Sequence, residues 1–296
     1  MDEFSPLFSI VLLFIGLSIL LHSVTVRTGS PVLAILSRWL RWISMSLALA
    51  YLIVSFGWSD RPFWLLSLTV FLGWFIFETG ISWLSISALS RSDMPLFPRF
   101  RENTSGQEWP MQKNLFRLRD WLRENGFKKR VALEARMPGG ADLKCSVFES
   151  VDATIRAYIH FFPLRNGGTT STFSLATKTE DGTTVITDNS FIPFGGFYPD
   201  NYYVVRKPLL RSFQKLVRLH EKRIARFSDE VIAMWVSDPV DDLNTQQREI
   251  ERINTDLGFL LPLEEQEEYG RISREGRYRI WKEIWLMNYL GWSRRY

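Results

Sequence analysis

Three apolar runs fill the first ninety residues, and they constrain the fold more than any other feature. They cover residues 4–26, 31–58 and 62–89, with short polar segments between them. About 20 helical residues cross the ~30 Å hydrocarbon core of a bilayer. A backbone in lipid must satisfy its own hydrogen bonds, which a helix does. The acidic leader Asp2–Glu3 argues against a cleaved signal peptide, so the sequence predicts three transmembrane helices.

Three charged side chains interrupt these runs: Arg38 and Arg41 in the second and Glu78 in the third. An unpaired charge in hydrocarbon is costly. If the two helices are antiparallel neighbours, Glu78 lies at about the depth of the two arginines. We therefore expect a membrane-embedded pair that fixes helix packing. The alternatives are an ion or proton path, and a contact of Glu78 with another subunit of a membrane complex.

The distribution of basic residues predicts the orientation. Cations lie between the first and second runs and again after the third: Arg27, Arg38, Arg41, Arg91, Arg99, Arg101 and Lys113. Because basic segments stay on the cytoplasmic side, we expect the N-terminus outside a bacterial plasma membrane. The long C-terminal part would then be cytoplasmic.

Composition narrows the possibilities for that part. About 200 of the 296 residues remain outside the apolar runs, with one cysteine, three histidines and a net charge of +4 for the whole chain. One cysteine excludes an internal disulfide and a cysteine-rich zinc module. The sequence has no nucleotide-loop, metalloprotease or serine-hydrolase motif. We expect no catalytic motif, no cofactor and no metal.

The pattern after the membrane region predicts an α+β domain. Residues 91–110 form a linker, and residues 111–125 carry apolar side chains at helical spacing. Residues 129–204 then contain four runs with alternating apolar residues, which indicate a four-stranded antiparallel meander. The helix and the meander together make up the domain 111–204. Turn residues at 138–140, 166–168 and 181–182 separate the strands.

Two side chains of the meander were candidates for chemistry. Cys145 alternates with Leu143 and Val147, so we expect it to be a small core residue. His160 alternates out of the apolar set of its own strand and is expected on the surface-facing side.

An aromatic loop follows the meander at residues 191–203. It carries Phe194, Phe197, Tyr198 and Tyr202 among glycines and prolines. Exposed, such a loop would be a binding surface. Buried, it would wrap the edge of the core.

The region 205–296 is expected to be helical and to pack on the domain. Residues 207–227 form a basic amphipathic helix that carries Arg211, Lys215, Arg218 and Lys222. These cations could be neutralised by the acidic segment 229–268, could bind anionic lipid, or, least favoured, could bind nucleic acid. Further helices are predicted over residues 244–257, 262–269 and 274–290, the last capped by Ser273 and bearing an aromatic stripe.

Three segments resemble uncharacterised bacterial membrane-anchored proteins with a cytoplasmic α+β domain: residues 121–127, 180–189 and 219–223. These segments are a helix end, a hairpin and a helix. The resemblance implies the fold and no activity.

Two classes of function follow. The first is a non-enzymatic membrane-tethered binding or scaffold protein that contacts the anionic bilayer, a protein partner or a second copy of itself. The second is a membrane-anchored enzyme with a site near residues 191–203 and His160 or His220 as its base. A third possibility is a subunit of a membrane complex.

Overall fold

The computed structural model describes residues 6–28, 30–106, 108–138, 142–163, 168–227, 231–266 and 270–294. It divides into two compact units. The first comprises Met1–Ala88 with Ile284–Gly291, and the second comprises Leu89–Glu283 with Trp292–Tyr296.

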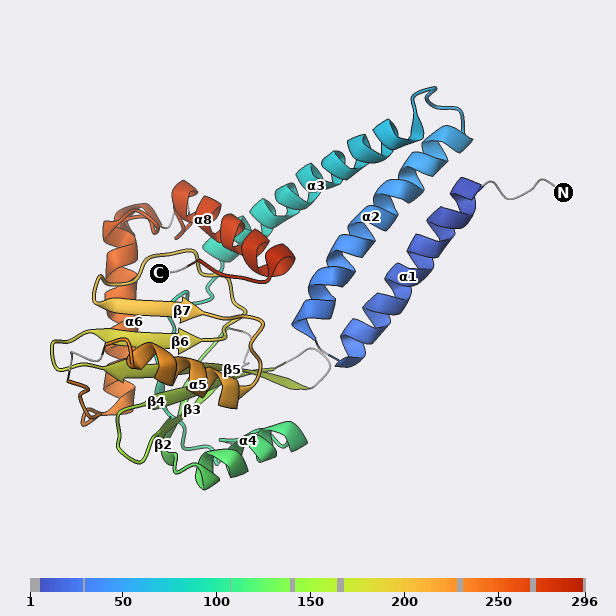
Figure 1. Cartoon of the computed structure of the whole chain (residues 1–296). Coiled ribbons are helices and arrows are strands. Elements are labelled where there is room, and N and C mark those ends of the chain that lie inside the picture. Colours follow the sequence, from blue (N-terminus) through green and yellow to red (C-terminus); the bar gives the residue numbers. More distant parts are fainter. Residues whose placement is uncertain are drawn as a thin grey trace. The chain divides into compact units, whose positions relative to one another are not determined.

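Three long helices build the first unit: α1 (Pro6–Thr28), α2 (Pro31–Ser55) and α3 (Phe63–Arg91) (Figure 1). All three are long and apolar enough to cross a membrane. This confirms the prediction of three apolar N-terminal helices. Ser30 and Pro31 begin α2 as its N-cap and first residue, which is the position where the missing N–H of proline costs nothing.

A seven-stranded sheet forms the centre of the second unit, in the order β1 to β7 along the chain. Its strands are β1 (Arg101–Glu102), β2 (Lys128–Ala135), β3 (Leu143–Glu149), β4 (Arg156–Pro163), β5 (Thr169–Lys178), β6 (Thr184–Asp188) and β7 (Tyr202–Arg206). The neighbours from β1 to β6 are antiparallel, while β6 and β7 are parallel.

The predicted four-stranded meander is therefore wrong in its strand count. The run at the end of the meander is two strands, because Gly182 turns the chain at φ +90° between β5 and β6. The two edge strands come from the segments expected to be linker and loop. Residues 139–141 and 164–167, which contain parts of the other two predicted turns, lie outside the described residues.

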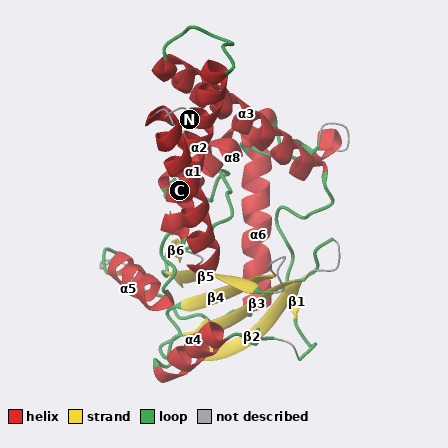
Figure 2. Cartoon of the chain, turned by 90° about the vertical axis from the view of Figure 1, so that its right-hand side faces the viewer, coloured by secondary structure: helices red, strands yellow, loops and turns green. Residues whose placement is uncertain are grey.

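Helices cover both faces of this sheet (Figures 1 and 2). Helices α4 (Lys113–Glu124) and α5 (Phe213–Ile224) pack on one face, where Leu118, Ile159 and Leu216 belong to one apolar cluster. Helix α6 (Pro239–Asp256) packs on the other, where Leu243 meets Val147 and Val204. The domain thus has three layers, with a core on each side of the sheet.

The strand register corrects the predicted faces. Cys145 pairs directly with His160, so both side chains lie on the α6 face. His160 is not on a solvent-facing surface, since α6 and two loops cover this side of the sheet. The alternation itself was read correctly within each strand. The assumption that one face is solvated was wrong.

Several helix bounds also differ from the predictions. Helix α5 begins six residues later than expected, because Ser212 accepts a hydrogen bond from the Lys215 N–H and caps it. Helix α6 begins five residues earlier, at Pro239, with Asp238 as its N-cap. The C-terminal helix α8 (Arg274–Trp285) continues as a π-helix, Leu286–Leu290. Of the predicted acidic helix, Leu263–Glu265 is a 3₁₀ turn and residues 267–269 lie outside the described part.

Candidate functional site

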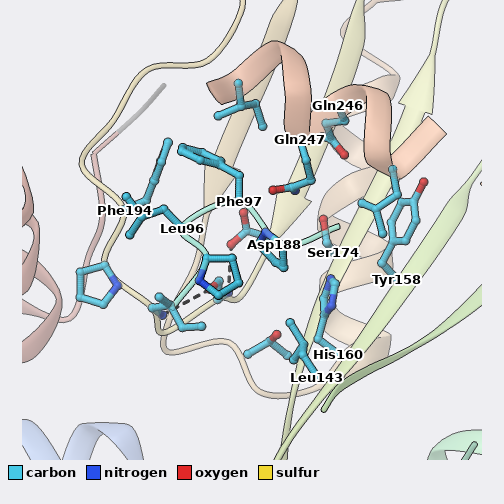
Figure 3. A pocket seen from close by; sticks show the side chains of 18 of the residues that line it. Leu96, Phe97, Leu143, Tyr158, His160, Ser174, Asp188, Phe194, Gln246 and Gln247 are labelled. Carbon is cyan, nitrogen blue, oxygen red and sulfur yellow. Dashed lines mark hydrogen bonds between the residues drawn. The ribbon is translucent and has the colours of Figure 1, made fainter. Parts of the chain in front are cut away.

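A cavity of about 380 Å³ lies in the second unit on the α6 side of the sheet. Its floor is formed by strands β4 to β7, and α6 provides one wall. The other walls are the segment 94–100 and the loop 190–198. Most of the lining is apolar, with Leu96, Phe97 and Phe194 at one side (Figure 3).

The polar residues of the floor form a row set by the strand register. Ser174 on β5 pairs with Asp188 on β6, and Asp188 pairs with Arg206 on β7. His160 on β4 lies one row away, opposite Thr172. Figure 3 shows His160, Ser174 and Asp188 around the same space as Gln246 and Gln247 of α6.

Burial dominates the chemistry of His160. Its Nδ1 atom is buried and has no hydrogen-bond partner among the described residues. Desolvation lowers the pKa of His160 to about 4, although the nearby charge of Asp188 acts in the opposite direction. The imidazole is therefore neutral at neutral pH. Its ring lies 6.0 Å from that of Phe100, centroid to centroid.

Asp188 and Arg206 form a buried ion pair beside this histidine. Asp188 Oδ1 accepts hydrogen bonds from Arg206 Nε and from the Ser190 N–H, each at 2.9 Å. Arg206 also donates to the Ile192 carbonyl at 3.1 Å and lies 3.3 Å from the Tyr198 hydroxyl. The Arg206 and Asp188 side chains are 6 % and 8 % exposed, so each charge is neutralised by the other instead of by water.

The predicted aromatic loop is packed in its central part, while Phe191, Ile192 and Tyr203 near its ends are exposed. Asn254 of α6 accepts from the Phe197 N–H and donates to the Phe197 carbonyl, both at 2.8 Å. Gly195 has φ +70°, and a Cβ there would meet the α8 backbone at 2.7 Å, so the close approach requires glycine. Within this loop Phe194 and Tyr198 line the cavity.

The other two aromatic candidates have separate partners. The Phe197 ring lies 3.9 Å below the Arg279 guanidinium, which is a cation–π contact. The Tyr202 hydroxyl donates to Glu249 at 2.9 Å, and burial raises the pKa of Tyr202. Both residues therefore attach the loop to helices rather than face a ligand.

Of the four basic candidates, Lys215, Arg218 and Lys222 belong to α5, and Arg211 directly precedes its N-cap Ser212. Arg211, Lys215, Arg218 and Lys222 are all exposed. None forms an ion pair with any residue in the described part of the chain. The predicted neutralisation by residues 229–268 is not seen among described residues; Asp229, Glu230, Glu267 and Glu268 lie outside them. Asp242 and Glu251 pair instead with Arg156 and Arg99.

His220 and Cys145 are core residues. The two nitrogens of His220 contact the hydroxyls of Thr177 at 3.1 Å and Thr187 at 2.8 Å. Desolvation lowers the pKa of His220 to about 3. Cys145 is 1 % exposed, and burial raises the pKa of its thiol. In the described residues neither His160 nor His220 hydrogen-bonds a carboxylate, which is what a general base of the enzyme alternative would require.

The charged membrane residues meet a segment from the other end of the chain, within the first unit. Arg38 Nη1 donates to the Asn288 carbonyl at 2.8 Å, and the Tyr289 hydroxyl donates to Glu78. Among the described residues no ion pair joins Glu78 to Arg38 or Arg41. Trp42, 3 % exposed, stacks on Phe71 at 4.8 Å beside this contact.

The sequence did not single out several polar residues of the cavity, among them Ser174, Asp188, Arg206, Gln246 and Gln247. Asp188 was assigned no role within the meander, and Arg206 was counted among the cations around the basic helix, because β7 was not expected. The signal that could have shown them is the run Tyr202–Arg206, whose aromatic and β-branched residues favour a strand. No signal in the sequence placed α6 over this part of the sheet.

In comparisons with protein-family models, with curated proteins and with solved structures, nothing matches this chain. The class of protein is therefore defined by its structure alone. Three helices that can span a membrane are joined to an α+β domain with a cavity and an exposed basic helix. Among the described residues there is no group of histidine, cysteine and acidic side chains that could hold a metal ion.

Proposed function

We propose that the protein is a non-enzymatic, membrane-tethered binding protein whose α5 helix contacts an anionic membrane surface. The observation that carries this proposal is a set of four exposed cations, three on α5 and Arg211 just before it, without ion-pair partners among the described residues. Each Lys or Arg near an anionic leaflet contributes about 1 kcal/mol. Four together would hold the helix at the headgroups when the domain is already tethered.

The packing of α5 supports a surface role. Phe213, Leu216 and His220 fill its inner side and are buried against the sheet. Its apolar side is therefore not available for insertion into lipid. The contact would be electrostatic, and salt should weaken it, because the Debye length falls from ~10 Å at 0.1 M salt to ~3 Å at 1 M.

The orientation belongs to the same proposal. Basic residues flank the membrane helices on the side from which the α+β domain emerges. The positive-inside rule places this side in the cytoplasm, where the anionic leaflet of a bacterial plasma membrane would be the partner of α5.

The experiment uses the full chain in nanodiscs with a dye on Glu221→Cys of α5 and spin-labelled headgroups as quenchers. We expect strong quenching in discs containing anionic lipid, weak quenching in neutral discs, and loss of the difference at 1 M salt. Replacing Arg211, Lys215, Arg218 and Lys222 by Gln should remove the effect of anionic lipid.

A matched control replaces four exposed cations of α6 and α8 by Gln: Arg248, Arg252, Arg274 and Lys282. The change in net charge is the same, so this variant should keep the quenching of the unaltered chain. Equal quenching in neutral and anionic discs would contradict the proposal. The exposed cations would then be better explained by an acidic protein partner.

A further inference from the structure

The cavity on the α6 side of the sheet has features of a ligand site that the contact of α5 with lipid does not use. Its volume of about 380 Å³ falls within the usual range of small-molecule pockets, ~300–1,000 Å³. It lies entirely within the second unit. Its walls are mainly apolar, as most such pockets are.

Several polar groups in the lining have no protein partner. The His160 Nδ1 is buried without a hydrogen bond. The side chains of Ser174, Gln246 and Gln247 form no hydrogen bond with any residue that the structure describes, and all three are partly buried. A buried polar group left unsatisfied costs about 1–3 kcal/mol. A bound molecule with a complementary group would recover part of that cost.

The charges of the lining point to an uncharged ligand. Asp188 and Arg206 are each other's partners at 2.9 Å, so neither offers a free counter-charge. The other polar side chains of the lining carry only uncharged groups: an imidazole, several hydroxyls and two amides. An anion or a cation entering this space would lose its hydration without gaining a partner of opposite charge.

We propose that this cavity binds a small, uncharged, largely apolar molecule that carries one or two hydrogen-bonding groups. The apolar walls hold its body, and His160, Ser174 and the two glutamines receive its polar group. Leu89 and Met94 also line the cavity. Leu89 belongs to α3, whose apolar stretch can span the bilayer. A ligand dissolved in the membrane and one dissolved in water would satisfy the same chemistry.

The test compares three probes with one ring system: 4-fluoro-1-naphthalenemethanol, 4-fluoro-1-naphthoate and 4-fluoro-1-naphthylmethylammonium. Their binding to the full chain in neutral-lipid nanodiscs is followed by ¹⁹F relaxation, with empty nanodiscs subtracted. We expect the alcohol to bind at least about tenfold more tightly than either ion, ~1.4 kcal/mol. Tighter binding of the anion or the cation, or equal signals with and without protein, would overturn the proposal.

Two variants locate the site. Ser174→Phe fills the cavity from its floor and should abolish binding of the alcohol. If this variant does not fold, Gln247→Leu removes one polar group and should weaken binding about three- to tenfold, since one neutral hydrogen bond is lost. Gln214→Leu is the matched control, because it removes an amide from α5 on the other side of the sheet. Equal affinity of Gln247→Leu and Gln214→Leu would place the alcohol outside this cavity.

The same assay separates the two sources of ligand. Raising the lipid-to-protein ratio at constant total alcohol lowers its concentration in water. An occupancy that follows the concentration in the membrane would assign a membrane-dissolved ligand, and one that follows the aqueous concentration would assign a water-dissolved ligand. The assay uses neutral lipid throughout, so its result does not depend on whether α5 binds anionic headgroups.

Discussion

Two histidines of this protein show how the same side chain takes different roles from its surroundings. His220 lies between two threonine hydroxyls, at 2.8 and 3.1 Å, in a fully buried position. His160 is partly buried near Asp188, and its buried Nδ1 atom has no hydrogen-bond partner among the described residues. The first is satisfied inside the core. The second faces a cavity, where a ligand can reach it.

Both residues make folding sensitive to acid. Burial lowers the pKa of His220 to about 3 and that of His160 to about 4, against 6.5 for the unperturbed side chain. The unfolded chain therefore binds more protons below pH 6.5. The stability present above that pH is lost as the pH falls, by about 1.4 kcal/mol per pH unit and histidine.

We predict that lowering the pH from 6.5 to 5 costs about 2 kcal/mol for each of these two histidines. Thermal unfolding of the full chain in nanodiscs should show the loss as a lower midpoint at pH 5. His220→Gln should be less stable than the unaltered chain at pH 7, but its loss of stability between pH 6.5 and 5 should be only about half as large. His160→Gln should also halve this loss of stability. An unchanged pH dependence in both variants would show that other groups titrate.

At the scale of elements, hydrophobic periodicity predicted individual helices and strands but not how the strands pair. The helix over Leu115, Leu118 and Leu122 and the strands around Val147 and Ile159 follow directly from apolar spacing. The pairing of Cys145 with His160 does not, because register depends on how two separate strands align. His160 was placed in solvent because its face of the sheet was assumed to be open, whereas α6 and two loops cover that face.

The edge strands were missed for a different reason. Strand β1 has only two residues. Its segment is attached to α6 by Asn244, which accepts a hydrogen bond from the Phe100 N–H and donates one to the Phe100 carbonyl, both at 2.7 Å. Strand β7 is parallel to β6 and follows a loop, so no hairpin signal announces it. Long-range contacts of this kind leave no local pattern in a sequence. Two cavity residues come from these missed parts of the sheet: Arg206 lies on β7, and Phe100 directly precedes β1.

Helix α6 is held on the sheet by a buried cation. Arg156 of β4 is 0 % exposed and forms ion pairs with Glu149 at 2.7 Å and Asp242 of α6 at 2.5 Å. Its guanidinium also lies 4.2 Å from the Trp235 ring. Without Arg156, the ion-pair partners left among the described residues would be only the half-exposed Arg130 for Glu149, at 2.7 Å, and only Lys178 for Asp242, at 3.4 Å. Breaking a buried ion pair in this way costs about 3–5 kcal/mol.

We therefore predict that Arg156→Met lowers the free energy of unfolding by about 3–5 kcal/mol and increases hydrogen exchange in α6. Lys178→Met is the matched control. Lys178 also pairs with Asp242, at 3.4 Å, and contacts Trp235, but it is 38 % exposed. Its loss should cost less than about 1 kcal/mol. Similar losses in the two variants would show that Arg156 does not hold α6.

At the scale of the whole molecule, the C-terminal segment belongs to the membrane unit. Residues Ile284–Gly291 lie with the three long helices. Tyr289 bonds Glu78, and its ring stacks on Trp285 at 4.2 Å. The sequence predicted a helix with an aromatic stripe here. It could not predict the partner, because the contact spans more than two hundred residues.

The orientation of the chain in the membrane can be tested by thiol labelling, because the chain has only one native cysteine. Cys145 is 1 % exposed, so it should not react with a maleimide. We place Ser59→Cys in the α2–α3 connection and Asn114→Cys on α4, each in a Cys145→Ala background. The positive-inside rule predicts that a membrane-impermeant maleimide labels residue 59 in intact bacteria and residue 114 only after permeabilisation. Unfolded protein controls for equal reactivity of the two thiols. The reverse pattern would place the α+β domain outside the cell, away from the cytoplasmic leaflet, and would remove the partner proposed for α5.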